Sequence, residues 1–190
     1  MMDRRNRKII ILEQNRQVEK IKYLNLLKER PSYGSTNHGK NALGFITEYL
    51  KNYERGTIVD FGCGANNFLL SFRNKHNCIG IDFVNPKADL IESMHKTSLP
   101  NNIADVTTSF DALEHLLPEE VDEVLEEMRR VSKPNKPFVF SISHKPSRIT
   151  SLGKNLHPTV KTRKWWIDKL MKYSYDIKDS NNYLNGLFRK

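Results

Sequence analysis

The amino-acid sequence predicts an α/β fold: a doubly wound, seven-stranded, mostly parallel sheet with helices on both faces and an antiparallel hairpin at its C-terminal end. Two observations predict it. Short apolar runs, which are typical of buried strands, alternate with segments of helical periodicity. Two further strand patterns follow each other directly near the C-terminus. A length of 190 residues fits one such domain.

Four apolar runs form the expected core of the sheet. They lie at residues 57–61, 78–82, 104–109 and 137–143. Helical patterns occupy residues 67–74 and 118–131, and the second repeats its apolar side chains on one helix face. Strands that alternate with helices imply a parallel sheet that is covered on both faces.

Helices are also expected before this core. Residues 12–30 predict an amphipathic N-terminal helix that ends before Pro31. Its apolar side chains at near-helical spacing are Leu12, Val18, Ile21, Leu24 and Leu27. Residues 31–41 are rich in turn formers and predict a loop, and residues 42–53 predict a second helix.

The segment after the core predicts one more helix and the hairpin. Thr162 is a suitable N-cap for a helix at residues 163–173. The hairpin strands are expected around Tyr175 and at residues 184–188, with Asn181 and Asn182 in the turn between them.

Composition describes an ordinary folded protein, with 38% hydrophobic and 28% charged residues. No apolar run approaches the roughly 20 residues of a membrane span, so we expect no membrane partner. Cys63 and Cys78 form neither a disulfide framework nor a metal-ligand pair, which favours a cytoplasmic location. The formal net charge of +9 indicates either an anionic partner, such as nucleic acid or a phosphorylated metabolite, or a merely solvated surface.

The strongest motif is a glycine turn directly after the first strand. Residues 58–66 read IVDFGCGAN, an apolar run that continues into D-x-G-x-G. Glycines allow a tight turn and a close approach of backbone to a ligand. A dinucleotide fingerprint would need a third glycine at Asn67, and no Walker loop is present. The motif therefore predicts a ligand site that is neither an NAD site nor a P-loop.

An acidic residue ends the next strand. Asp82 stands 22 positions after Asp60. In open α/β sheets this is where an acid binds the two hydroxyls of a ribose. Glycine turn and acid together predict a nucleoside-containing ligand.

With these motifs the chain resembles the class I S-adenosylmethionine-dependent methyltransferases, and the resemblance covers most of the chain. It implies that the glycine turn wraps the methionine part of the donor and that Asp82 binds the ribose beside Phe83 at the adenine. The family's third glycine is Asn66 here. The residues expected to bind the donor are Asp60, Gly62, Cys63, Gly64, Asp82, Phe83, Met94, His95, Ser109 and Phe110.

The resemblance also divides the single domain, residues 1–190, into three parts. Residues 1–53 are expected to form N-terminal helices and a lid-like loop, residues 54–145 the cofactor-binding core, and residues 146–190 an acceptor-side segment with the hairpin. The lid would be the loop at residues 33–40, whose alternative is a plain surface connection. On the late helix, either Trp165 and Trp166 both pack in the core or one of them stacks on the acceptor.

Polar side chains follow the fourth and fifth strands, whose carboxyl ends should face the ligand. They are Asp111, Glu114, His115 and His144, and we expect the catalytic groups among them. Acceptor activation needs a group that takes or stabilises charge as the methyl group is transferred. His115 would act as a metal-free base or positioning group, or be a structural histidine.

The segment DALEH, residues 111–115, also looks like the E-x-x-E-H segment of small-RNA 3′-end 2′-O-methyltransferases and ubiquinone-pathway O-methyltransferases. That resemblance implies an alternative in which Asp111, Glu114, His115 and His157 bind Mg²⁺ or Mn²⁺. Asp111 replaces the first glutamate of the pattern. The metal-free site is the favoured expectation.

Three functions follow from these residues. The first is O-methylation of a polar, anionic small molecule such as a sugar or nucleotide-linked sugar, because the chain leaves room for no separate RNA-binding module. The second is 2′-O-methylation of RNA, which the net charge and the E-H pattern favour. The third is donor binding without catalysis.

Overall fold

A seven-stranded sheet forms the centre of the computed structural model, which describes residues 3–180 and 183–189, apart from the side chains of Arg4 and Arg5. The strand order is β3-β2-β1-β4-β5-β9-β8. Strands β1 to β5 pair in parallel, and β9 runs antiparallel to both β5 and β8. Their bounds are β1 Thr57–Phe61, β2 Asn77–Asp82, β3 Leu90–Ile91, β4 Val106–Phe110, β5 Pro137–Ser141, β8 Ser174–Asp179 and β9 Leu184–Phe188. The expected fold class is confirmed.

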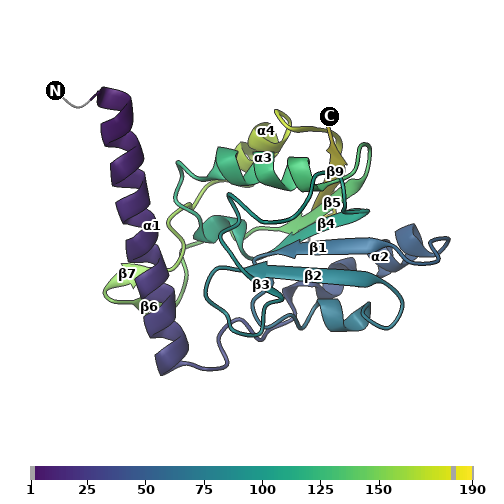
Figure 1. Ribbon diagram of the computed structural model, residues 1–190, viewed down its shortest axis with the longest axis horizontal. Helices are drawn as coiled ribbons and strands as arrows, with labels where there is room; N and C mark the ends of the chain where they lie inside the picture. The colour runs from purple at the N-terminus through teal and green to yellow at the C-terminus, as the bar shows by residue number, and fades with distance from the viewer. Residues whose placement is uncertain (1–2, 181–182, 190) are drawn as a thin grey trace.

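Helices cover both faces of this sheet (Figure 1). One face carries α3 (Val121–Val131) and α4 (Arg163–Leu170), and the other carries η1 (His38–Ala42), α2 (Leu43–Leu50) and η2 (Leu69–Ser71). Neighbouring strand residues face opposite ways, so Ile58 packs with α2 and Val59 with α3. The sheet is thus buried on both sides, and its carboxyl edge is left to bind ligands.

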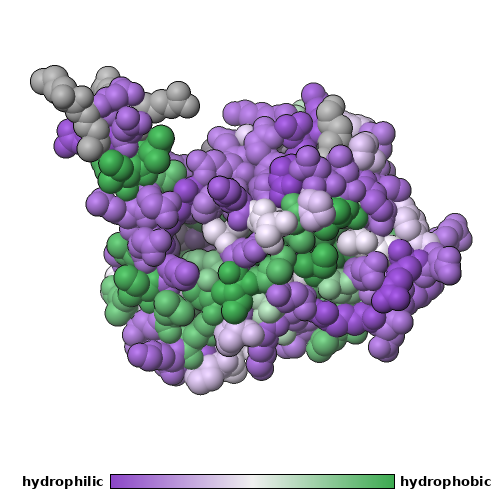
Figure 2. Space-filling view, in the orientation of Figure 1, coloured by the Kyte–Doolittle hydropathy of each residue, from purple (hydrophilic) through white to green (hydrophobic). Residues whose placement is uncertain are grey.

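The long helix α1 (Arg4–Glu29) lies beside the sheet against the small hairpin of β6 (Thr150–Ser151) and β7 (Lys154–Asn155) (Figure 1). The expected apolar face is wrong: Val18, Ile21 and Leu24 are exposed, at 40%, 56% and 46%. Instead Tyr23 and Leu26 are buried against Leu156. Figure 2 accordingly shows apolar surface on α1. Spacing alone predicted the helix, but its contacts with the hairpin decide which side is covered.

The helix expected at residues 67–74 is absent from the described chain, which forms consecutive turns around the short η2. These turns still bring Phe68, Leu69 and Phe72 to the sheet. Their spacing is also that of one helix face, so the apolar pattern alone does not distinguish a helix from short turns. The helix expected at residues 42–53 is also shorter, because α2 ends at Leu50.

Other boundaries agree more closely with the sequence. The Thr162 side chain caps α4 by accepting a hydrogen bond from the amide of Trp165 at 3.2 Å. Strands β8 and β9 form the expected hairpin, and the turn predicted at Asn181 and Asn182 lies outside the described residues. Among the described residues, the longest helices fall short of the apolar length needed to cross a lipid bilayer.

Candidate functional site

A cavity of about 900 Å³ lies at the carboxyl edge of the sheet. Its wall combines the ends of β1, β2 and β4 with α1, the loop at residues 31–41 and the segment at residues 143–149. The glycine turn lines one part of this cavity, and His115 and His157 line another. Most of the side chains expected at the site from the sequence therefore line one cavity.

The glycine turn has the backbone conformation that its sequence predicts. Gly62 and Gly64 have positive φ angles of 78° and 53°. A Cβ at Gly64 would overlap the carbonyl oxygen of Gly34, which itself accepts a hydrogen bond from Ala65 at 2.9 Å. These glycines thus permit close packing of the neighbouring loop as well as approach to a ligand.

Asn66 replaces a third glycine without disturbing the turn. Its φ angle is 65°, in the left-handed region that asparagine tolerates better than most residues. Its side-chain amide donates to the carbonyl of Lys87 at 2.8 Å. The departure from the family pattern is therefore accommodated locally.

Two carboxylates flank this turn. Asp60 is buried and accepts a 2.7 Å hydrogen bond from the Thr108 hydroxyl, and burial raises its pKa to about 7. Asp82 accepts bonds from the amides of Gly64, Val84 and Asn85 at 3.2, 3.0 and 2.9 Å. These contacts hold the Asp82 carboxylate at the cavity wall, where an oxygen lone pair can still accept a hydroxyl.

The remaining residues expected at the donor divide into two groups. Cys63, Phe83, Met94 and Phe110 line the cavity. The structure places the other two, Ser109 and His95, outside the cavity wall. Ser109 is buried behind the wall, with its hydroxyl donating to the carbonyl of Phe61 at 2.9 Å. His95 lies in a separate surface depression beside α3, because the chain turns away from the cavity after Met94.

Asp111 and Glu114 follow β4, and their pKa values are shifted in opposite directions. Burial opposes ionisation of Asp111, but hydrogen bonds from His38 at 2.7 Å and from Ser141 at 2.9 Å lower its pKa overall. Glu114 is fully buried, and burial followed by repulsion from Asp111 raises its pKa to about 8. Its Oε1 accepts the Ser143 amide at 3.0 Å, while Oε2 lacks a partner among the described residues.

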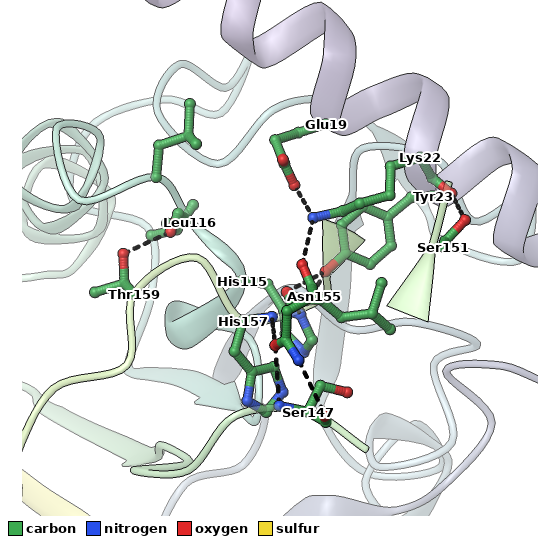
Figure 3. A network of polar contacts seen from close by, with 12 residues as sticks. Glu19, Lys22, Tyr23, His115, Leu116, Ser147, Ser151, Asn155, His157 and Thr159 are labelled. Carbon is green, nitrogen blue, oxygen red and sulfur yellow. Dashed lines mark hydrogen bonds and ion pairs between the residues drawn. The ribbon is translucent and has the colours of Figure 1, made fainter. Parts of the chain in front are cut away.

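The tautomer of His115 follows from its contacts. Its Nδ1 lies 2.7 Å from the carbonyl oxygen of Leu156, an atom that only accepts hydrogen bonds, so Nδ1 carries the proton. The Tyr23 hydroxyl contacts the same nitrogen and donates to the Leu156 carbonyl at 3.0 Å (Figure 3). Burial, then the nearby His157, lowers the pKa of His115 to about 4. The ring is therefore neutral at pH 7, with Nε2 as a hydrogen-bond acceptor.

His157 lies beside His115, whereas His144 does not. The two ring centroids are 4.6 Å apart, and His157 Nδ1 lies 2.6 Å from the carbonyl oxygen of Lys145. Potential ligand atoms of Glu114, His115 and His157 fall within 4.8 Å of one another, and Asp111 is not part of this group. The structure does not bring His144 to this group: it lies outside the cavity wall, with Nδ1 3.2 Å from the Lys161 carbonyl oxygen.

Sequence reasoning did not single out several residues of the cavity wall. They are Tyr23, Arg30, His38, Asn85, Lys145 and Arg148. His38 belongs to the loop expected as a lid, and Asn85 follows β2. The other four reach the cavity from α1, the residue after it and the segment after β5, so their local sequence offers no signal. The two tryptophans both join the core cluster: Trp166 is fully buried, and Trp165 packs between Lys161 and Lys169.

The fold and site define a Rossmann-like protein with a ligand cavity at the carboxyl edge of its sheet. A model of the methyltransferase domain family matches residues 35–175. The chain therefore belongs to the methyltransferase domain family, and it is an enzyme of this type. No curated protein sequence matches the chain.

Solved structures share the fold at low sequence identity. The PH0226 protein of Pyrococcus horikoshii OT3 superposes with a TM-score of 0.68 at 16% identity, covering 87% of this chain and 98% of that one. The 1,6-didemethyltoxoflavin-N1-methyltransferase of Burkholderia thailandensis superposes with a TM-score of 0.66 at 11% identity. The match covers 100% of this chain and 92% of that one. Phosphoethanolamine N-methyltransferase 2 of Haemonchus contortus superposes with a TM-score of 0.60 at 11% identity. The match covers 88% of this chain and 60% of that one. All three support the class I fold.

Proposed function

We propose that this methyltransferase uses S-adenosylmethionine to methylate an oxygen atom of a polar small molecule. The observation that supports this most strongly is the single cavity, which joins the glycine turn and Asp82 to His115 and His157. The Burkholderia and Haemonchus structures contain S-adenosylhomocysteine and S-adenosylmethionine respectively. Their shared fold is consistent with a donor of this type here.

The residues at the glycine turn fit the donor chemically. Asp60 offers a buried carboxylate to the cationic end of the donor, and Asp82 offers an acceptor to the ribose hydroxyls. Phe83 and Met94 supply apolar surface for a purine. Bound there, the donor supplies an electrophilic methyl group.

His115 is the group that we assign to the acceptor. Its neutral ring presents Nε2 as an acceptor for a substrate hydroxyl, while Leu156 fixes the proton on Nδ1. Such a contact aligns the hydroxyl oxygen and takes up its proton as the new bond forms. His157, Asp111 and the protonated Glu114 complete a polar wall around that oxygen.

Donor binding and turnover test the proposal separately. Calorimetry with S-adenosylhomocysteine should show binding to the wild type and a loss of at least about tenfold in affinity for Asp82→Ala, since a hydrogen-bonded carboxylate is removed. Absence of heat with the wild type would refute the donor assignment. Donor binding without turnover on sugars, nucleotide-linked sugars or RNA would instead favour a non-catalytic protein.

A metal-assisted site is a second candidate, because Glu114, His115 and His157 lie close together. A carboxylate and two imidazoles suit Mn²⁺, although Glu114 would have to lose the proton that burial favours. Once an acceptor is found, a chelator should abolish turnover and Mg²⁺ or Mn²⁺ should restore it if this site binds metal. Unchanged turnover would leave the metal-free role of His115.

A further inference from the structure

The cavity wall carries charged side chains of both signs. Its carboxylates include Asp60 and Asp82 at the ends of β1 and β2. Its cations are Arg30, which follows α1, and Lys145 and Arg148, which follow β5. Leu26 of α1 and Ile149 belong to one apolar cluster, so the segment of Arg148 lies beside the end of α1. A cationic donor and an anionic acceptor group would each meet the complementary charge.

These cations are available to a ligand. Many basic side chains of the described residues are paired, such as Arg16 with Glu120, Lys133 with Asp105 and Lys169 with Asp122. In contrast, the cationic groups of Arg30, Lys145 and Arg148 form no ion pair or side-chain hydrogen bond with any described residue. Their positive charge is therefore uncompensated at the cavity mouth.

The backbone that carries two of these cations is held in place from behind. Asn155 accepts the amide of Ser147 at 3.0 Å and donates to the Ser147 carbonyl at 2.8 Å. Figure 3 shows Asn155 between Ser147 and His157. The same Asn155 oxygen accepts the amide of His157 at 2.9 Å, and His157 in turn contacts the Lys145 carbonyl. Lys22 of α1 donates to the Asn155 carbonyl at 3.2 Å. The segment at residues 145–149 is thereby fixed relative to α1 and Arg30.

From this arrangement we propose that Arg30, Lys145 and Arg148 form a subsite for a phosphoryl group of the methyl acceptor. The proposal rests on the proposed function and specifies its substrate class as a phosphorylated small molecule. Two guanidinium groups can each present paired N–H donors to phosphate oxygens, which suits a multiply charged phosphoryl group better than a single carboxylate.

Inorganic pyrophosphate is the probe that tests the subsite. We would titrate it by calorimetry into the full chain saturated with S-adenosylhomocysteine. The variant carrying Arg30→Ala, Lys145→Ala and Arg148→Ala should bind pyrophosphate at least about tenfold more weakly, since each exposed cation contributes modestly and three are removed. Binding to the wild type should weaken as salt is raised.

A matched variant removes the same number of charges elsewhere. Lys75→Ala, Lys96→Ala and Lys172→Ala alter exposed lysines that lie outside the cavity wall. This variant should bind pyrophosphate within about twofold of the wild type, because distant exposed charges are screened. Equal weakening in both triple variants, or no pyrophosphate binding to the wild type, would overturn the subsite.

The same titrations separate this proposal from the proposed function. S-Adenosylhomocysteine should bind both triple variants as it binds the wild type, since none of the six residues lies at the glycine turn. Donor binding without pyrophosphate binding rejects only the subsite, whereas failure of the donor to bind rejects the proposed function. Retention of a ten-nucleotide RNA that both triple variants weaken equally would favour a diffuse basic surface and overturn the subsite.

Discussion

Asp60 shows how burial of one side chain can control ligand binding. Its carboxyl is removed from water, which raises its pKa to about 7, and the Thr108 hydroxyl stabilises the ionised form only in part. A cationic ligand group beside it favours ionisation. Donor affinity should therefore rise with pH up to about 7 and then level off, because only below that pH must binding release a proton from Asp60.

Asp60→Asn is the control for this pH dependence. Asparagine can still accept the Thr108 hydrogen bond, but it does not titrate. Calorimetry of S-adenosylhomocysteine between pH 5.5 and 8.5, a range about 1.5 units either side of the Asp60 pKa, should give a flatter profile for this variant than for the wild type. Identical profiles would assign the titration to another group, with Glu114 the next candidate because its pKa is raised to about 8.

Residue patterns alone identified the donor side of the site better than the acceptor side. The spacing from Asp60 to Asp82 places both carboxylates at the same cavity because β1 and β2 are parallel neighbours. His144 was expected in the cavity, but beyond the end of a strand the alternation of side chains no longer fixes which way a residue faces. Tyr23 and Arg30 were missed because their contacts join segments far apart in the chain.

At the scale of elements, a single hydrogen bond at the start of α4 can be tested by one substitution. The Thr162 hydroxyl satisfies the Trp165 amide at the start of α4, and this helix buries Trp166 in the core. Thr162→Ala should lower the free energy of unfolding by about 1 kcal/mol. Urea denaturation measures the change, and Thr162→Ser should retain most of the stability.

The loop at residues 31–41 is fastened to the core by an ion pair. His38 bonds to Asp111 at 2.7 Å, which raises the pKa of His38, while burial and the nearby Lys40 oppose this. A raised pKa means that the contact stabilises the loop at low pH and that this stability is lost as pH rises through the pKa of bound His38. Toward acid, the contact weakens as pH falls through the lowered pKa of Asp111.

Hydrogen exchange of the loop amides tests this fastening. Protection factors for residues 34–40 should fall between pH 6 and 9, a range that begins near the ordinary pKa of about 6.5 for histidine. His38→Gln should show lower protection at pH 6 and little further change. A pH-independent protection factor in the wild type would show that other contacts, such as the bond from Ala65 to Gly34, hold the loop.

For the whole molecule, the main difference between sequence and structure concerns α1. Helical periodicity predicted its existence, and the family match begins only at residue 35, after the helix ends. Yet α1 supplies Tyr23 to the cavity and is followed directly by Arg30, and its Lys22 joins the contacts that hold the segment at residues 145–149. A methyltransferase core alone would therefore lack part of this cavity wall, which helical periodicity cannot show.

Tyr23→Phe tests whether α1 acts on the chemistry. The variant keeps the ring that packs edge-on against Phe83, with 5.2 Å between the two ring centroids. It removes the hydroxyl that contacts His115 and Leu156. We expect donor affinity to stay within about twofold and stability to fall by about 1 kcal/mol, the net value of one hydrogen bond. Turnover should fall about tenfold, because His115 loses a contact that orients its ring.

Turnover and binding must be measured on the same preparation for this test. A loss of kcat with an unchanged dissociation constant for S-adenosylhomocysteine would show that α1 positions His115 for the transfer step. A parallel loss of donor affinity would mean that the hydroxyl supports the whole cavity through α1. Unchanged kcat would contradict the role of Tyr23, since the Leu156 carbonyl would then orient His115 by itself.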